Sequence, residues 1–175
     1  KPAAVLVPLV MRTEPTVLLT QRTDQLKQHA GQISFPGGRQ DPEDPHAEAT
    51  ALREAQEEVG LPPQRVEVLG ALPRYTTGTG YIVTPVVGLI HPEPDEAATL
   101  RLQAQASEVA DIFEVPLRFL MDPRHHQRRG LQIGDQQLEF FAMPWLDAQA
   151  QERFIWGATA AMLRDRKSTR LNSSH

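Results

Sequence analysis

The chain contains 175 residues with a formal net charge of −4 and 40% apolar residues, which predicts one globular domain and argues against a general nucleic-acid binder. The absence of cysteine excludes disulfides, thiolate metal sites and a thiol nucleophile, and it is compatible with a cytoplasmic location. Because no apolar run approaches the roughly 18 residues of a membrane span, we expect no membrane partner.

The two ends of the chain are set apart from the expected domain. The chain begins at Lys1 without methionine and enters a strand-like run almost at once, so we expect the natural N-terminus to be missing. The segment Lys167–His175 is polar and aperiodic, which predicts a disordered tail. It also resembles a translated sequencing-adapter read-through. We therefore expect the folded domain to occupy residues 1–166.

Apolar, β-branched runs predict the strands of the domain. They lie at Ala3–Met11, Val17–Thr20, Val66–Leu72 and Ile82–Ile90. Between the second and third of these runs, a helix is predicted from His46 to Val59. Asp44 is its expected N-cap, Pro45 takes its first position, and Gly60 lies just beyond its end.

The second half of the chain has weaker patterns. Residues 91–108 are rich in Pro, Glu and Ala, which predicts a surface excursion. A second helix is predicted over Ala150–Asp165, because apolar residues recur there at helical spacing: Phe154, Ile155, Ala158, Ala161 and Met162. On such a helix, Phe154 and Trp156 would serve packing rather than base stacking. Strands interleaved with few helices predict a mixed α/β or α+β sandwich with helices covering a central sheet.

Three glutamates are the main candidate ligands. At about 100° per residue, Glu54, Glu57 and Glu58 share one side of the first predicted helix, while apolar residues line another: Ala51, Leu52, Ala55 and Val59. Like charges at i,i+4 destabilise a helix, and a cation would remove that cost. The alternative is a solvated acidic face with Arg53 as its neighbour. The upstream segment Phe35–Gly38, "FPGG", favours a tight turn with exposed carbonyls, and Mg²⁺ or Mn²⁺ prefers such oxygen ligands.

Other reactive patterns are weak in this sequence. His125 and His126 adjoin each other, and adjacent side chains diverge from most backbones, so a solvated loop is favoured over a metal site. Neither a nucleophilic-serine motif nor a Walker-type Gly-Lys-Ser/Thr loop is present. Covalent catalysis is therefore not indicated.

The glutamates belong to a stretch that resembles a known family signature. "REAQEEVGL", Arg53–Leu61, is similar at every position to the second half of the Nudix box. The upstream half is one residue longer than the general pattern, because Gly38 and Asp44 each lie one position early. That lengthening is expected in the coenzyme A pyrophosphatase branch of the family.

A second signature of that branch precedes the glutamates. "LLTQRTDQLKQHAGQISFPGG", Leu18–Gly38, resembles it in all spacings, with Thr23 in place of Ser or Ala and Lys27 in place of Arg. Lys27 keeps the charge but loses the forked guanidinium geometry. In the context of this signature, Arg22, Lys27 and His29 resemble phosphate-binding residues. Outside that context they would form an ordinary basic surface loop.

The resemblance carries expectations for the fold and for the acidic residues. It extends to three later stretches, Thr79–Gly88, Ser107–Leu117 and Ile155–Leu163, and implies the Nudix α/β/α sandwich with a mixed sheet between helices. Glu54 and Glu58 would hold Mg²⁺ or Mn²⁺, and Glu57 would hold a further ion or orient water. Arg53 would steady these carboxylates as a salt-bridge partner. Glu108 would be a further acidic ligand or base, with a strand-edge charge as its alternative.

The resemblance also implies a small-molecule substrate. Arg22, Lys27, Gly37 and Gly38 would bind coenzyme A or one of its thioesters, and hydrolysis of the pyrophosphate bond would give 3′,5′-ADP and 4′-phosphopantetheine or its acyl derivative. One alternative is a Nudix hydrolase of another nucleoside diphosphate derivative, such as an ADP-sugar or a dinucleotide. The other is a catalytically silent module that senses a nucleotide.

Overall fold

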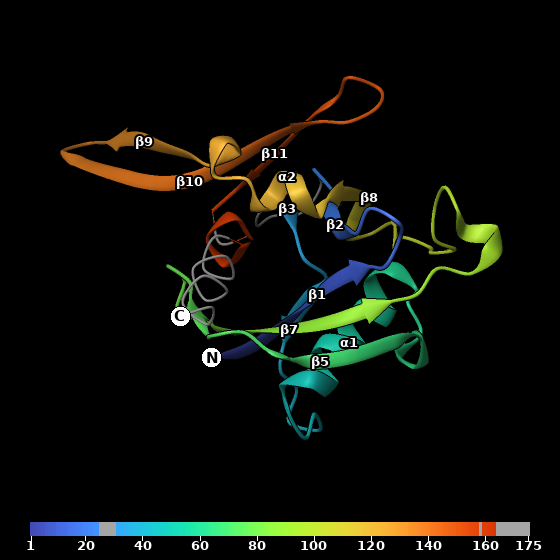
Figure 1. Ribbon diagram of the computed structural model, residues 1–175. Helices are drawn as coiled ribbons and strands as arrows, with labels where there is room; N and C mark the ends of the chain where they lie inside the picture. Colours follow the sequence, from blue (N-terminus) through green and yellow to red (C-terminus); the bar gives the residue numbers. More distant parts are fainter. Residues whose placement is uncertain (25–30, 158, 164–175) are drawn as a thin grey trace, which may run out of the picture.

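The computed structural model describes residues 1–24, 31–157 and 159–163, so Lys27, His29 and the expected tail Lys167–His175 lie outside the described residues. The main sheet of this part of the chain has eight strands: β1 (Pro2–Val10), β2 (Thr16–Arg22), β3 (Ile33–Ser34), β4 (Gly37–Arg39), β5 (Val66–Ala71), β6 (Tyr75–Thr76), β7 (Ile82–Ile90) and β8 (Val109–Pro116). The second sheet has three: β9 (Gln127–Ile133), β10 (Gln136–Leu146) and β11 (Glu152–Trp156). The labelled helical segments are α1 (Ala47–Val59), α2 (Leu117–Met121) and the 3-10 turns η1 (Pro63–Arg65), η2 (Pro94–Glu96) and η3 (Pro123–His125), and residues 159–163 are also helical (Figure 1). The fold is the expected mixed α/β class.

β1 organises the main sheet, because it has different partners along its length. It runs parallel to β7 over all nine of its residues. On its other edge, Leu9 and Val10 pair with β2, whereas residues 3–5 pair with β4. The sheet therefore opens between β2 and β4, next to the glycines of the FPGG segment.

Alternate residues of β1 fill two hydrophobic cores, one on each face of the sheet. Ala4, Leu6 and Val10 pack in the core beneath α1, together with Ala51, Ala55 and Val59 of the helix. Residues 3, 7 and 9 face the opposite core, which is covered by Leu120 of α2, Met143 of β10, Ile155 of β11 and Ala160, Met162 and Leu163. The period of two, apolar on both faces, matches a strand buried between two layers.

The predicted second helix is wrong over its first half. Residues 152–156 form β11, which pairs antiparallel with β10, and helix is present only at residues 159–163 among the described residues of this region. Arg153 and Ile155 are buried while Trp156 is 38% exposed, so the side chains alternate as on a strand. Phe154 contacts the guanidinium of Arg129 on the neighbouring hairpin, and its apolar spacing with Ile155 did not reflect a helix.

Residues 91–108 lie mostly at the surface, as expected, and two buried residues anchor the segment. Glu96 is fully buried and pairs with Arg65 at 2.5 Å, with its second oxygen 2.9 Å from the same guanidinium. Arg12 also donates to the Glu96 carbonyl at 2.6 Å. Leu100 packs in the core beneath α1. The alternation of charged and small residues in this segment hides these anchors in the sequence.

The FPGG segment does not form the expected tight turn at its glycines. Gly37 and Gly38 belong to β4 and pair with Val5 and Ala4 of β1. Extended backbone here continues the sheet toward α1.

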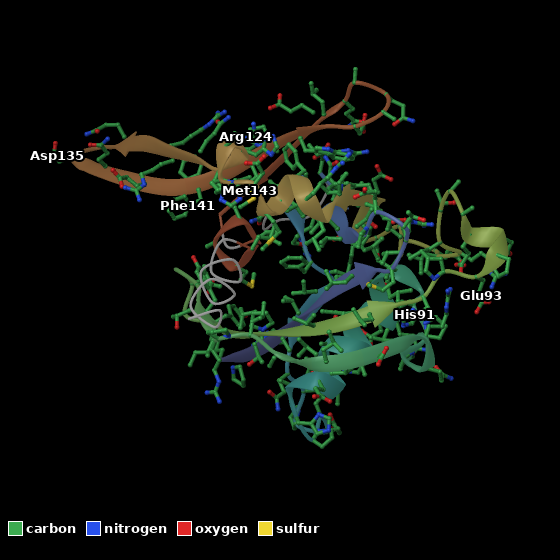
Figure 2. All side chains as sticks on the ribbon, viewed as in Figure 1. His91, Glu93, Arg124, Asp135, Phe141 and Met143 are labelled. Carbon is green, nitrogen blue, oxygen red and sulfur yellow. The ribbon has the colours of Figure 1, made fainter. Side chains whose placement is uncertain are left out.

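The β9–β10 hairpin projects from the body of the molecule, with Asp135 at its tip (Figures 1 and 2). His91 and Glu93 lie at the opposite side of the molecule in the same view (Figure 2). No helix in the described parts of the chain is long and apolar enough to cross a membrane.

Candidate functional site

Helix α1 carries the acidic residues, and its ends are fixed by specific contacts. His46 rather than Asp44 is the N-cap, because its Nδ1 accepts a hydrogen bond from the Ala49 N–H at 3.1 Å. At the other end, Gly60 adopts φ 69°, the left-handed conformation that favours glycine, as the sequence predicts. Main-chain N–H groups of Gln103 and Gln105 then donate to the last helical carbonyls, those of residues 59 and 58.

Asp44 binds Arg53 instead of capping the helix. The guanidinium makes a forked contact with the Asp44 carboxylate, at 3.1 Å from Nε and 2.9 Å from one terminal nitrogen. It also contacts Glu54 at 3.1 Å and the Arg39 carbonyl at 3.2 Å. This pairing holds the pKa of Asp44 well below its usual range. Arg53 thus joins the end of β4 to α1, the structural position expected for it.

The two glycines of β4 make room for different neighbours, Gly38 for Glu54 of α1 and Gly37 for the adjacent strand β1. A Cβ on Gly38 would lie 2.7 Å from the carboxyl carbon of Glu54, and one on Gly37 would lie 2.5 Å from the Ala4 carbonyl oxygen. Glycine is needed at these two positions because neighbouring atoms leave no room for a side chain, and not because the backbone makes a tight turn there.

Glu58 has a buried carboxyl group, and few contacts offset the cost of ionising it. The residue is 4% exposed, and one oxygen accepts a hydrogen bond from the Gly37 N–H at 3.2 Å. Burial raises the pKa of Glu58 to about 8, and the charges of Glu54 and Glu108 act in the same direction. Burial also raises the pKa of Glu54.

This donor set fits a divalent cation. The single N–H and the positive field of Arg22 offset only part of the cost of charging Glu58. A hard cation would offset the rest, because carboxylate oxygens are the ligands it prefers. Glu54 and Glu58 are the residues whose positions suit it.

Glu57 is more exposed than Glu54 and Glu58, although its charge acts on Glu54 and raises the pKa of that carboxyl. On a helix, residues four apart differ by about 40° in direction, whereas Glu57 and Glu58 differ by about 100°. The Glu57 side chain is 53% exposed and contacts Arg53 at 3.3 Å. Within residues 1–24, 31–157 and 159–163, no group of three or more His, Asp or Glu side chains is arranged to hold a metal ion. Arg53 therefore joins the exposed Glu57 to Glu54, while Glu58 lies buried beside the β4 backbone.

Glu108 lies close enough to Glu54 and Glu58 for its charge to raise the pKa of both of these carboxyl groups. Its main chain is held on both sides, because its N–H donates to the Gln105 carbonyl and its carbonyl accepts from the Thr23 N–H, each at 3.0 Å. Glu108 directly precedes β8 and follows the segment that caps α1.

A cavity of about 900 Å³ opens beside the glycines of β4. Gly37, Gly38 and Arg39 form one wall, and Arg22 at the end of β2 forms another. The Nε atom of Arg22 is buried and has no hydrogen-bond partner among the described residues. An unpaired buried donor of a cation is costly, and an anion in the cavity would pair with it.

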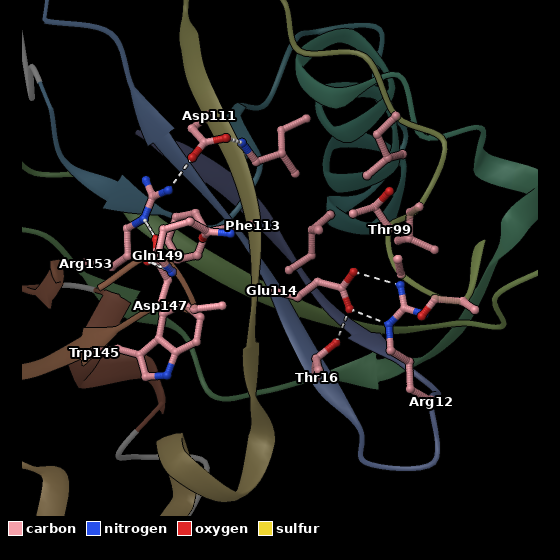
Figure 3. Close-up of a pocket in the computed structure, with 17 residues that line it drawn as sticks. Arg12, Thr16, Thr99, Asp111, Phe113, Glu114, Trp145, Asp147, Gln149 and Arg153 are labelled. Atoms are coloured by element: carbon pink, nitrogen blue, oxygen red, sulfur yellow. Dashed lines mark hydrogen bonds and ion pairs between the residues drawn. The ribbon is translucent and has the colours of Figure 1, made fainter. Parts of the chain in front are cut away.

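A second cavity, of about 560 Å³, is lined by side chains that already neutralise one another (Figure 3). Arg12 makes a forked contact with Glu114, with nitrogen–oxygen distances of 2.8 and 2.9 Å. Arg153 pairs with Asp111 and, at 3.3 Å, with Asp147. An anion would therefore find fewer unpaired cationic groups in this cavity than in the first.

The two adjacent histidines are packed rather than solvated. The His125 ring stacks on Phe119 with centroids 4.0 Å apart, and its Nδ1 lies 3.0 Å from the Phe119 carbonyl oxygen. His126 Nε2 lies 2.7 Å from the carbonyl oxygen of Leu120. Both rings secure the end of α2.

The aromatic lining of the larger cavity was not predicted from the sequence. Tyr75 and Tyr81 come from the β6–β7 region, and Trp156 comes from the end of β11. The strand-like alternation of residues 153–156 could have placed Trp156 on an exposed face, but the helical spacing nearby obscured it.

Comparisons with known proteins agree with this geometry. A family model described as the NUDIX domain matches residues 1–132. The protein called "Uncharacterized Nudix hydrolase NudL" in Escherichia coli (strain K12) is 45% identical over 164 residues, which cover 93% of this chain and 79% of the relative. The Citrobacter koseri protein of the same description matches with the same identity and coverage.

Solved structures show the same fold at lower identity. A Caenorhabditis elegans Ap4A hydrolase binary complex has a TM-score of 0.54 and 18% identity, covering 66% of this chain and 80% of that one. A Nudix hydrolase from M. smegmatis, RenU, has a TM-score of 0.55 and 24% identity, covering 67% and 71%.

Proposed function

Because the chain belongs to the Nudix family of pyrophosphohydrolases, we propose that its substrate is coenzyme A or one of its thioesters. The enzyme hydrolyses the pyrophosphate bond of a nucleoside diphosphate derivative. With coenzyme A, the products would be 3′,5′-ADP and 4′-phosphopantetheine or its acyl derivative.

The setting of Arg22 is the observation that carries this substrate proposal. Arg22 lies in the stretch that resembles the coenzyme A signature, it lines the 900 Å³ cavity, and its buried Nε lacks a partner among the described residues. Coenzyme A carries a 3′-phosphate besides its pyrophosphate, and a protein with a net charge of −4 needs specific cations to attract it. Lys27 is proposed as a second such cation from the sequence alone.

The proposed chemistry adds water across the P–O–P linkage. Nudix hydrolases generally need divalent cations, and such an ion held by Glu54 and Glu58 would neutralise phosphate charge and acidify a water. The water oxygen forms a bond to one phosphorus, the bridging P–O bond breaks, and the leaving phosphate departs as an anion. A nearby carboxylate accepts the proton of the water.

Glu108 is the candidate for that proton acceptor, and Glu57 has a different proposed role. Glu108 interacts electrostatically with the metal-binding pair and its main chain is fixed at both ends, which favours precise placement. Glu57 is more exposed and is engaged by Arg53, and it is the candidate for orienting water or a further ion. Arg53 acts as a positioning residue through its contacts with Asp44 and Glu54.

Product analysis tests this proposal. The wild-type protein would be incubated with coenzyme A, acetyl-coenzyme A, an ADP-sugar and a dinucleotide, each with Mg²⁺ or Mn²⁺, and the products separated by chromatography. We expect 3′,5′-ADP from the coenzyme A forms at the highest kcat/KM. A clear preference for the ADP-sugar or the dinucleotide would favour a Nudix hydrolase of another nucleoside diphosphate derivative. Binding without turnover of any substrate would favour a nucleotide sensor.

A further inference from the structure

Trp156 stands at the wall of the larger cavity in an unusual setting for a large apolar side chain. It is 38% exposed, although its strand neighbours Arg153 and Ile155 are buried. The indole lines the same cavity as Arg22. An aromatic surface left open in a substrate cavity offers a platform for a flat ring.

Neighbouring contacts fix the position of this indole. The Phe140 ring meets it edge-on, with centroids 5.6 Å apart and an interplanar angle of 65°. Gly157 follows at φ 66°, and its N–H donates to the Phe141 carbonyl at 3.2 Å, so the chain turns immediately after the tryptophan. Little side-chain entropy would be lost when a ligand stacks on a ring held in this way.

Gln32 lines the same cavity as Arg22 and Trp156. The Gln32 carbonyl accepts a hydrogen bond from the Arg22 N–H at 2.9 Å. The Gln32 side chain lies near Gly157, the residue after Trp156, because a Cβ built on this glycine would be 3.8 Å from Gln32 Nε2. Arg22, Gln32 and Trp156 therefore line one cavity, which offers an aromatic face and a guanidinium nitrogen that has no hydrogen-bond partner among the described residues.

The other aromatic wall is already engaged. The Tyr81 ring lies under two cations, with Lys1 Nζ at 5.4 Å and the Arg39 guanidinium carbon at 5.8 Å from its centroid. Among the described residues, no cation lies over the ring of Trp156. An incoming base would thus meet less competition at Trp156.

We propose that Trp156 stacks on the adenine ring of the substrate, with the ribose phosphate directed toward Arg22. The inference rests on the proposed function, because an adenosine 3′-phosphate carries a flat base and an anion on one ribose. It assigns the adenosine half to the Trp156 end of the cavity and leaves the pantetheine arm to the Tyr81 end. Base–aromatic stacking of this kind contributes substantially to affinity and tolerates Phe or Tyr in place of Trp.

Fluorescence tests the stacking without turnover. Because the chain has two tryptophans, a Trp145→Phe background leaves Trp156 as the only one. In metal-free buffer, 3′,5′-ADP should quench its emission saturably, and 4′-phosphopantetheine should not. Quenching by 4′-phosphopantetheine in place of 3′,5′-ADP, or by neither, would overturn the assignment.

Kinetics supply a second readout with a matched rescue. Trp156→Leu should raise KM for coenzyme A roughly 5- to 100-fold, while Trp156→Phe should keep most of the affinity. Unchanged melting temperatures would show that both variants fold. If wild-type protein hydrolyses coenzyme A and Trp156→Leu does so equally well, the stacking role is wrong and the substrate proposal stands. If 3′,5′-ADP quenches Trp156 but coenzyme A is not hydrolysed, the stacking role stands and the substrate proposal fails.

Discussion

Glu58 is a buried carboxyl whose ionisation opposes folding in the absence of a cation. Its folded pKa of about 8 lies well above the value of about 4.3 for an unfolded glutamate. The folded state therefore binds this proton more tightly, and its contribution to stability is fully present below about pH 4.3. That contribution declines as the pH rises toward 8. A cost of this kind at a family signature residue is typical of a functional site.

Glu58→Gln should abolish turnover and should stabilise the metal-free protein at pH 8.5. The amide removes the buried charge and its repulsion with Glu54, while it also removes a ligand for the cation. Melting temperatures in EDTA at pH 5 and pH 8.5 measure the effect, which should shrink at the lower pH. Glu57→Gln is the matched control, because its side chain is 53% exposed and the stability of this variant should change little. An active Glu58→Gln enzyme at limiting Mg²⁺ would refute the ligand assignment.

At the scale of elements, the packing of β4 against α1 depends on missing side chains. Gly38→Ala should reduce kcat by at least about tenfold, because the new Cβ would displace the Glu54 carboxylate by pressing on it from 2.7 Å. The comparison is Gly88→Ala on β7, where the Cβ would lie 2.4 Å from a methyl carbon of Val66, away from the glutamates.

The two variants should separate activity from stability. Gly88→Ala should cost roughly 1–3 kcal/mol of unfolding free energy through overpacking but should retain the activity of each folded molecule. Steady-state rates and urea unfolding curves measure the two effects. Equal losses of kcat in both variants would mean that the carboxylate is not positioned by β4.

The segment from 91 to 108 is an element that can be tested through its ion pairs. Arg65–Glu96 and Arg101–Asp95 have the same closest separation, 2.5 Å, but Glu96 is buried and both members of the second pair are exposed. Arg65→Met should cost about 3–5 kcal/mol, because it leaves a buried charge unpaired. Arg101→Met should cost less than about 1 kcal/mol. Chemical denaturation of both variants measures these losses of unfolding free energy. Similar losses in the two variants would contradict the anchoring role of Glu96.

Acid should reveal the same anchor. Pairing with Arg65 lowers the pKa of Glu96 to about 2, so its stabilising contribution is present above about pH 4.3 and is lost as the pH falls toward 2. Unfolding free energies measured between pH 5 and pH 2.5 should therefore fall less steeply for Glu96→Gln than for the wild type. Parallel pH profiles for the two proteins would show that this pair does not link protonation to folding.

Across the whole molecule, periodicity predicted the elements that pack by simple alternation. The strand over residues 82–90, the helix ending at Val59 and its glycine cap appear as expected, since local pattern and tertiary burial agree there. The helix predicted over residues 150–165 failed because β11 gains its pairing from β10, a contact that local spacing does not encode.

The site was predictable in part for a similar reason. Glu54, Glu58 and Arg53 lie in one stretch whose spacing fixes them on one helix. The burial of Glu58, the packing against Gly38 and the position of Trp156 depend on β4 and β11, which reach α1 and the cavity only through the tertiary fold.

The contribution of Arg22 to substrate choice tests the central claim most directly. kcat/KM would be measured for coenzyme A and for 3′-dephospho-coenzyme A, with wild-type protein and with Arg22→Ala. If Arg22 binds the 3′-phosphate, its loss should lower kcat/KM for coenzyme A by about 1–3 kcal/mol in transition-state binding and should affect the dephospho form much less. Equal use of both substrates by the wild type, with the same loss for both in Arg22→Ala, would contradict the proposal that this cavity is built for coenzyme A.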